Sequence, residues 1–262
     1  MIIGGGKMGQ ALARGFLSSG AVEPGSMAIV EVSESAKGEL SRLFPQSHIL
    51  PVPEPASSTI LAVKPGDVEA TISQLPDKSK QRVLSIAAGV STAALEVWLG
   101  GKVPVIRAMP NTPAMLGVGM TALCSGRFCV ESDLEWAERL MSGVGKVVVV
   151  KEALFDAVTA VSGSGPAYVF LVAEAMIDAA ISEGLSLDLA SQLVTQTIYG
   201  SASMLIGNES PTKLRHDVTS PGGTTAKGIS ALEEQALRAA FVQAISAASK
   251  RSKEIAAEIF KH

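Results

Sequence analysis

The chain of 262 residues is 47% hydrophobic and 18% charged, which is enough for one large domain or two moderate ones with buried cores. Its formal net charge is -3, without a block of like charge, so a nucleic-acid backbone or an anionic membrane is disfavoured as a partner. We therefore expect a small-molecule substrate. No basic segment followed by an apolar one opens the chain, so the cytoplasm is the expected location.

A glycine-rich stretch follows the first apolar residues. It reads G-x-G-x-x-G, with Gly4, Gly6 and Gly9 at the three glycine positions. The first glycine lets the chain turn sharply out of a strand, the second lets a pyrophosphate approach the backbone, and the third lets helix and strand pack closely. The helix that follows directs its free N–H groups at the phosphates. The stretch predicts dinucleotide contacts by Gly4, Gly6, Lys7, Met8 and Gly9.

The second strand of a βαβ unit is expected at residues 27–32, about 20 residues past the glycine stretch. Glu31 lies near its end, where an acidic side chain accepts hydrogen bonds from the ribose 2′-OH of NAD and repels the 2′-phosphate of NADP. Ser33 is the alternative ligand, because a serine suits that 2′-phosphate. NADH and NADPH both stay open as cofactors. Ser33 also begins a capped helix.

Strands and helices then alternate along the chain. Strand-like runs occur at 60–63, 83–87, 103–106 and 147–150, with helical patterns at 68–75, 93–99 and 134–141. This alternation predicts a mainly parallel, doubly wound sheet of the Rossmann type. Three prolines at 51–59 leave no room for a crossover helix, so that link is expected to be an extended loop.

Beyond residue 151 the pattern is helical to the end of the chain. Breaks are expected at 162–166, 184, 207–211 and 220–223, and the last helix has apolar residues three, four or seven apart from Leu237 to Ile259. We expect two domains, 1–151 and 152–262. The most apolar segment, 158–181, carries Glu174 and Asp178 and is expected to be a buried helix rather than a membrane span.

The helical domain is small for the apolar faces it presents. A second copy of the chain would cover those faces, so a homodimer is expected. The alternative is a monomer whose helices cover one another and the sheet.

Cysteines and histidines do not form a recognisable pattern. Cys124 and Cys129 are the only cysteines and lack a second ligand pair, so both are expected to be structural and no metal site is expected. The histidines are scattered at positions 48, 216 and 262. His216 is expected to be a surface residue at a helix end, with titration near neutral pH as the alternative.

Taken together, five stretches go beyond a generic dinucleotide fold. They are Gly4–Gly9, Ala62–Pro65, Ser85–Gly89, Arg107–Pro113, and Ser162–Tyr168 with Asp217–Thr225. In this combination the chain resembles the pyrroline-5-carboxylate reductases over nearly its full length, and VTSPGGTT at 218–225 is the most specific piece. The resemblance implies reduction of a cyclic imine to L-proline with NADPH or NADH, by a subunit that dimerises through its helical half.

The resemblance also implies roles for single residues. The turn at Ser220–Thr224 begins a helix and offers N–H groups and hydroxyls to an anion, so Ser220, Gly222, Gly223 and Thr224 would hold the substrate carboxylate. Thr225 would hydrogen-bond the ring nitrogen and is the candidate catalytic residue. Further cofactor contacts are expected from Ala62, Val63, Lys64, Pro65, Ala87 and Asn111.

The sequence departs from the family in three places. Only Met1–Ile3 precede the first glycine, which makes the first strand short, and the loop at 51–59 is shorter than usual. His216-Asp217 stands where family members more often have Asp followed by an apolar residue.

Two other classes of NAD(P)-binding protein share parts of this pattern. Dehydrogenases of hydroxy acids rely on a lysine of the second domain, but Lys213 and Lys227 do not match that pattern. A redox-sensing module that binds NAD(P)H would not need the stretch at 218–225.

Overall fold

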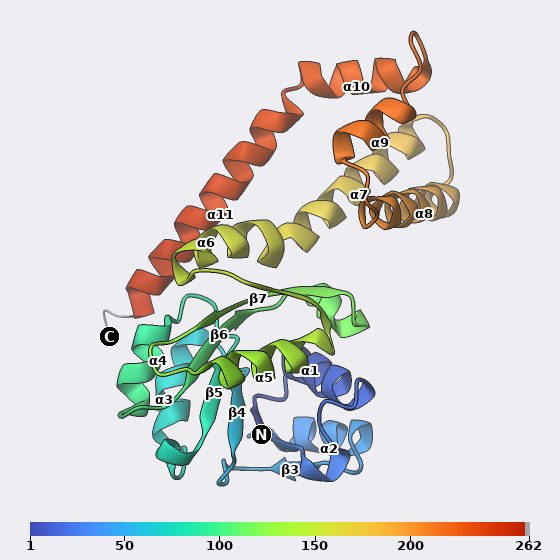
Figure 1. Ribbon diagram of the computed structural model, residues 1–262. Helices are drawn as coiled ribbons and strands as arrows, with labels where there is room; N and C mark the ends of the chain where they lie inside the picture. Colours follow the sequence, from blue (N-terminus) through green and yellow to red (C-terminus); the bar gives the residue numbers. More distant parts are fainter. Residues whose placement is uncertain (260–262) are drawn as a thin grey trace. The chain divides into compact units, whose positions relative to one another are not determined.

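The structure is a computed structural model that describes residues 1–259 (Figure 1). The described chain forms two compact units: residues 1–164 together with residues 247–259, and Gly165–Ser246. The first unit holds the sheet, and the second is helical. The division of the chain into domains at residue 151 stays a prediction, and His262 lies outside the described residues.

One sheet of eight strands organises the first unit. Its order is β3-β2-β1-β4-β5-β6-β7-β8, and every neighbouring pair is parallel except β6 with β7. The expected doubly wound, mainly parallel sheet is confirmed. The strands are β1 (Ile2–Ile3), β2 (Ala28–Val30), β3 (His48–Leu50), β4 (Ser58–Leu61), β5 (Arg82–Ser85), β6 (Val105–Met109), β7 (Gly119–Ser125) and β8 (Gly145–Val149).

Five helices cover the two faces of this sheet (Figure 1). They are α1 (Lys7–Ser18), α2 (Glu34–Leu43), α3 (Val68–Ser73), α4 (Thr92–Leu99) and α5 (Glu131–Ser142). Side chains of α1, α2 and α5 share one core with Ile2, whereas those of α3 and α4 share the other with Ile3. Successive strand residues point to opposite faces, so each strand of the sheet centre contributes to both cores.

The first strand is short but fully paired. Its two residues pair with β2 on one side and β4 on the other, and both are buried. Backbone bonds extend the ladder past its ends, from Gly4 N–H to the Val30 carbonyl (3.0 Å) and from Ile60 N–H to the Met1 carbonyl (2.9 Å). Residues 51–57, all within the described chain, contain no helix, which confirms the extended loop between β3 and β4.

The second half of the chain is helical as expected. The interruption expected at 162–166 takes the form of a π-helical turn at Thr159–Gly163 and a bend at Ser164, which separate α6 from α7. The Ser164 N–H bonds the Thr159 carbonyl at 2.8 Å, as in a widened helical turn. The helices are α6 (Phe155–Val158), α7 (Gly165–Ser182), α8 (Leu187–Leu205), α9 (Pro211–Asp217), α10 (Thr224–Glu234) and α11 (Leu237–Ile259).

The expectation that 158–181 forms a buried helix is wrong for a single chain. Within the described residues α7 has no buried side chain, and Phe170 and Leu171 are 61% and 64% exposed. The stretch Glu152–Ser182 is long and apolar enough to span a membrane, with a mean hydropathy of 1.3, although one such helix is weak evidence for a span. Apolar residues occur on all sides of α7, so its neighbours in one chain cannot cover them.

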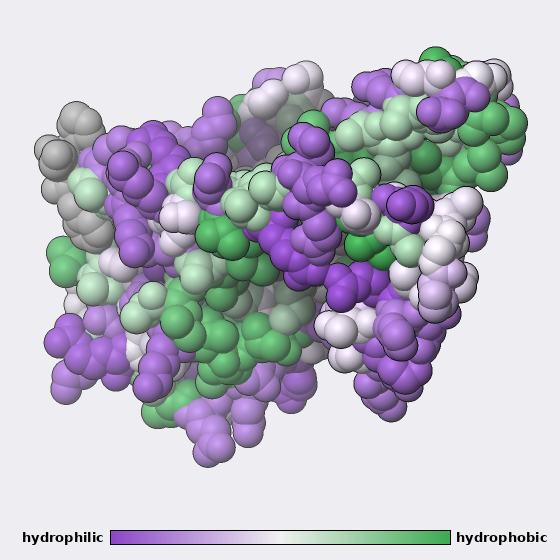
Figure 2. All heavy atoms as spheres, turned by 90° about the horizontal axis from the view of Figure 1, so that it is seen from above, coloured by the Kyte–Doolittle hydropathy of each residue, from purple (hydrophilic) through white to green (hydrophobic). Residues whose placement is uncertain are grey.

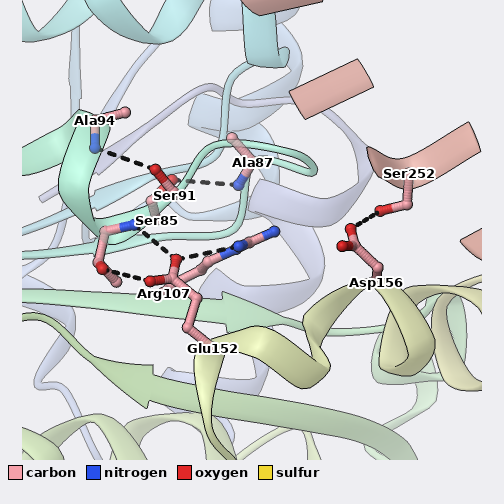
Figure 3. Close-up of polar contacts among 9 residues, drawn as sticks. Ser85, Ala87, Ser91, Ala94, Arg107, Glu152, Asp156 and Ser252 are labelled. Atoms are coloured by element: carbon pink, nitrogen blue, oxygen red, sulfur yellow. Dashed lines mark hydrogen bonds and ion pairs between the residues drawn. The ribbon is translucent and has the colours of Figure 1, made fainter. Parts of the chain in front are cut away.

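An ion pair between the buried Arg107 and the half-buried Glu152 anchors the first turn of the helical half to the sheet (Figure 3). Arg107 of β6 donates to Glu152 at 3.1 Å, and its guanidinium lies 4.5 Å from the centre of the Phe155 ring. The Glu152 carboxylate also accepts from the N–H and the hydroxyl of Thr92, at 2.8 and 2.6 Å. Three donors from β6 and α4 therefore meet on one carboxylate.

We expect Glu152→Ala to destabilise the protein by about 3 kcal/mol, because it leaves the buried Arg107 without its partner. The matched control is Thr92→Val, which removes one hydroxyl and should cost only about 1 kcal/mol. Urea unfolding followed by circular dichroism measures both. Equal midpoints for Glu152→Ala and the wild type would show that the ion pair contributes nothing.

Candidate functional site

The glycine stretch connects β1 to α1, and at two of its glycines a side chain would collide with backbone atoms. Gly4 has φ +107° and a Cβ there would lie 2.5 Å from the Ala62 carbonyl oxygen, while a Cβ at Gly9 would overlap the Gly4 carbonyl. At Gly6 a Cβ would meet no described atom within 4 Å. Gly6 is also the N-cap of α1, with no side-chain cap. The surface above Gly6 is therefore open, and the first N–H groups of α1 are free for a ligand.

A cavity of about 670 Å³ lies beside this loop, at the carboxyl ends of β1, β2 and β4. Ligands bind at this edge in open parallel sheets. Six of the predicted cofactor residues line the cavity: Gly4, Gly6, Glu31, Ala62, Val63 and Lys64. Pro51 and Pro53 also line it, so the short loop at 51–59 reaches the site.

Other cavity residues were missed from the sequence. Val32 at the end of β2 is 83% exposed, and Asp67, Ala70, Thr71 and Gln74 come from the segment around α3. The signal that could have indicated Asp67, Ala70, Thr71 and Gln74 is that the helical pattern of α3 begins only a few residues after Lys64.

The two candidate ribose ligands both have partners. The Glu31 carboxylate accepts from the N–H of Gly5 at 3.1 Å and from the N–H of Ser33 at 2.9 Å. Ser33 is the N-cap of α2, as expected, and its hydroxyl accepts from the Ala36 N–H at 3.4 Å.

The remaining predicted cofactor residues lie outside the lining of this cavity. Lys7 and Met8 form the first turn of α1, and Pro65 begins a short 3₁₀ turn. Ala87 is 3% exposed and donates to the Ser85 hydroxyl. Asn111 links two segments of the first unit: its amide nitrogen donates to the Ser162 carbonyl at 3.2 Å, and its oxygen accepts from the Met120 N–H at 2.9 Å.

The predicted carboxylate-binding turn lies between α9 and α10. Gly222 has φ +71°, which favours glycine, and the Gly223 N–H bonds the Ser220 carbonyl at 3.0 Å. A Cβ at Gly223 would lie 3.1 Å from the Ser220 hydroxyl, so the glycine leaves that hydroxyl room at the helix start. Thr224 and Thr225 form the exposed first turn of α10. The turn thus brings N–H groups and three hydroxyls together.

The helices differ in whether their N-cap residue supplies a side-chain acceptor. Ser33, Ser91, Ser186 and Ser210 cap α2, α4, α8 and α9 with their own side chains. In the described chain Asp67 and Leu154 give α3 and α6 no side-chain cap either, and α1 and α10 begin on Gly6 and Gly223, which have no side chain that could cap the helix. A helix start without its own acceptor keeps its N–H groups and its partial positive charge available to an anion. The starts of α1 and α10 are the ones for which the sequence predicted an anionic ligand.

The cysteines do not line the cavity, and His216 directly precedes the turn, where its carbonyl accepts from the Thr219 N–H at 3.0 Å. Cys124 is buried, which raises the pKa of its thiol to about 12, so it stays protonated and unreactive near neutral pH. Cys129 donates to the Val105 carbonyl. His216 lies exposed in the last turn of α9. Residues 1–259 contain no group of three or more His, Cys, Asp or Glu residues that could hold a metal ion.

Comparison with known proteins gives matches in both halves. Residues 152–255 match the family model for pyrroline-5-carboxylate reductase dimerisation, and residues 1–89 match that for NADP oxidoreductase, coenzyme F420-dependent. The pyrroline-5-carboxylate reductase of Mycobacterium tuberculosis is 38% identical over 282 residues, which cover 97% of this chain and 95% of that protein.

Solved structures extend the likeness to the fold. A pyrroline-5-carboxylate reductase from Coxiella burnetii superposes with a TM-score of 0.89 at 35% identity, and one from Plasmodium falciparum with NADP bound gives 0.86 at 30%. Each match covers 97% of both chains. Identity of this degree over nearly the whole length shows that the chain belongs to the pyrroline-5-carboxylate reductase family.

Proposed function

We propose that this chain catalyses the reduction of 1-pyrroline-5-carboxylate to L-proline with NAD(P)H, the last step of proline biosynthesis. The observation that carries the proposal is the pair of glycine-capped helix starts, at Gly6 and Gly223, in a chain that matches the family along its full length. The reaction needs a site for a pyrophosphate and a site for a carboxylate. Two helix starts without a side-chain acceptor meet both needs.

The cavity beside the glycine stretch fits a nicotinamide dinucleotide. The open surface at Gly6 admits the pyrophosphate, and the N–H groups of α1 hold it. We assign the adenosine side to the part of the cavity that Glu31, Val32 and Pro51 line, and the path toward the nicotinamide to the part that Ala62, Val63 and Lys64 line. When bound, NAD(P)H supplies the hydride that reduces the imine carbon.

The turn before α10 is the proposed substrate site. Ser220, Gly222, Gly223 and Thr224 offer N–H groups and hydroxyls to the carboxylate, which keeps its charge through the reaction. The Thr225 hydroxyl is assigned to the ring nitrogen, where it positions or supplies a proton. The imine nitrogen arrives already protonated, so the chain needs no strongly perturbed histidine or carboxylate.

We further propose that the chain works as a homodimer in the cytoplasm, with the helical half, 152–262, as its dimerisation domain. The match of 152–255 to the dimerisation model supports pairing. So does the hydrophobic surface that one copy leaves open, part of which is visible as green areas in Figure 2. Its members on α7, α8 and α11 include Val169, Phe170, Leu171, Leu193, Tyr199, Met204, Leu205, Phe241 and Val242.

The direct test is the reaction itself. We expect the purified protein to oxidise NADPH or NADH when 1-pyrroline-5-carboxylate is added and to form one L-proline per cofactor consumed. Absorbance at the nicotinamide band and chromatography of the product measure the two sides. Cofactor binding without proline formation would refute the enzyme assignment and favour the redox-sensing module.

The glycine stretch separates binding from folding. We expect Gly6→Ala to keep its unfolding free energy within about 1 kcal/mol, because its Cβ meets open space and the N-cap preference for glycine over alanine is about 1 kcal/mol or less. The same change should weaken cofactor binding at least about tenfold, or about 1.4 kcal/mol, by blocking the pyrophosphate.

Gly9→Ala is the matched control. Its Cβ would overlap the Gly4 carbonyl, so it should lose about 1–3 kcal/mol of stability. Calorimetric cofactor titration and urea unfolding are compared for both variants. Wild-type cofactor affinity in Gly6→Ala would remove the loop from the site.

Thr225 and Ser220 should affect different kinetic constants. A hydroxyl on the ring nitrogen improves as that nitrogen becomes an amine, whereas the carboxylate does not change. Thr225→Val should therefore lower kcat, by about 10²-fold if it supplies a proton and by about tenfold if it gives only a hydrogen bond. Ser220→Ala should mainly raise the substrate KM. The opposite pattern in steady-state kinetics would reverse the two roles.

A further inference from the structure

Glu31 stands where this fold commonly supplies a ribose ligand, but the backbone already engages its carboxylate. Oε2 accepts from the Gly5 N–H at 3.1 Å, and Oε1 accepts from the Ser33 N–H at 2.9 Å. One side chain therefore ties the glycine loop to the loop after β2. Hydrogen bonds to an ionised acceptor are about twice as strong as neutral ones.

Gly5 occupies a variable position of G-x-G-x-x-G, and packing requires a glycine there in this chain. A Cβ at Gly5 would overlap Cδ1 of Leu40 and lie 3.1 Å from Oε2 of Glu31. Leu40 is fully buried in α2, so moving its side chain aside would disturb the packing around it. The loop consequently lies directly against Glu31 and α2.

Both backbone groups of Gly5 are held by side chains. Glu31 accepts its N–H, and the Gln10 amide of α1 donates to its carbonyl at 2.9 Å. Neither bond belongs to a strand or helix ladder. The conformation of the loop between β1 and α1 thus depends on side chains from β2 and α1.

We propose that Glu31 is a positioning residue for the cofactor, which acts through Gly5 by holding the glycine loop in the form that leaves Gly6 open to the pyrophosphate. This inference rests on the proposed function, because it requires NAD(P)H as the ligand of the cavity. Without the carboxylate the loop samples other conformations, and binding must select one of them at a cost in affinity.

A positioning residue and a ribose ligand affect the cofactors differently. A carboxylate on the 2′-OH favours NADH and repels the 2′-phosphate, so its loss weakens binding of one cofactor and strengthens that of the other. A carboxylate that holds the loop serves the pyrophosphate, which both cofactors carry. Its loss weakens binding of both by the same factor.

The test compares Glu31→Gln with Glu34→Gln. Each removes one negative charge from the same corner, but Glu34 lies on the exposed first turn of α2 and pairs with Lys37 at 2.5 Å. ADP-ribose and its 2′-phosphorylated form are titrated by calorimetry, and exchange of the Gly5 and Ser33 amide hydrogens is followed by NMR in the cofactor-free protein.

We expect Glu31→Gln to weaken binding of both nucleotides by about tenfold or more and to speed exchange at Gly5 and Ser33, since hydrogen bonds to a charged acceptor are lost. Glu34→Gln should leave ADP-ribose binding within about twofold, because an exposed pair contributes little. Glu31→Asp keeps the charge but is too short to reach both amides, so it should also weaken both nucleotides.

Other results would overturn the inference. Weaker ADP-ribose binding with stronger binding of the 2′-phosphorylated form would make Glu31 a ribose ligand. Equal losses of nucleotide affinity in Glu31→Gln and Glu34→Gln would show that Glu31 acts only through its negative charge. Wild-type nucleotide affinity in Glu31→Asp would show that the two hydrogen bonds to Gly5 and Ser33 are not both needed. If the wild-type protein binds neither nucleotide, the proposed function fails instead.

Discussion

The close approach of α1 to β1 is the constraint on which the nucleotide half of this protein depends. A methyl group on Gly9 of α1 would overlap the Gly4 carbonyl oxygen, and one on Gly4 would overlap the carbonyl oxygen of Ala62 after β4. This contact sets the height at which α1 begins above the sheet edge. Because β1 lies between β2 and β4 at the centre of the sheet, the start of α1 opens onto the cavity between their carboxyl ends.

The helices also differ in how their N-termini are capped. Four helices are closed by a serine of the preceding loop, which satisfies one of the free N–H groups within the chain. The helices that start at Gly6 and Gly223 forgo that stabilisation, typically about 1 kcal/mol each. In the function that we propose, a bound anion would supply the missing acceptor and would interact favourably with the helix dipole. Without such an anion, these two helix ends are less stable than ends that a serine caps.

The sequence predicted what short-range chemistry decides. Hydrophobic alternation indicated the sheet, the glycine stretch indicated the loop at Gly4–Gly9, and Ser33 was assigned as a cap. The strand β7 was missed because Gly119–Ser125 has few β-branched residues and gains its pairing only from β6 and β8 on either side. The π turn at Thr159–Gly163 was missed because a glycine-rich stretch in a sequence predicts an interruption of the helix but does not say that the interruption takes the form of a π turn.

Long-range contacts account for the rest of the candidate site. Glu31 was placed at the correct strand end, but its bonds to Gly5 and Ser33 depend on how Leu40 seats α2 against the loop, which no local pattern reports. Asn111 was expected to face a ligand, and in the described chain its amide joins Ser162 to Met120. A polar residue on a constrained loop can bind a ligand or form hydrogen bonds that hold two segments of the chain together. The sequence does not distinguish these roles, because the partner within reach depends on the fold.

The two halves of the chain differ in how they bury apolar surface. The sheet half places helices over both faces of its strands, so it buries two hydrophobic cores within one copy. The helical unit has only Ala190 and Val194 among its buried hydrophobic residues within the described chain, while α7 is apolar on every side. At about 25 cal/mol for each Å² of apolar surface removed from water, a second copy can supply what the single chain lacks. In the homodimer that we propose, the stability of the helical half would therefore depend on protein concentration, whereas the nucleotide half has the core to fold within one chain.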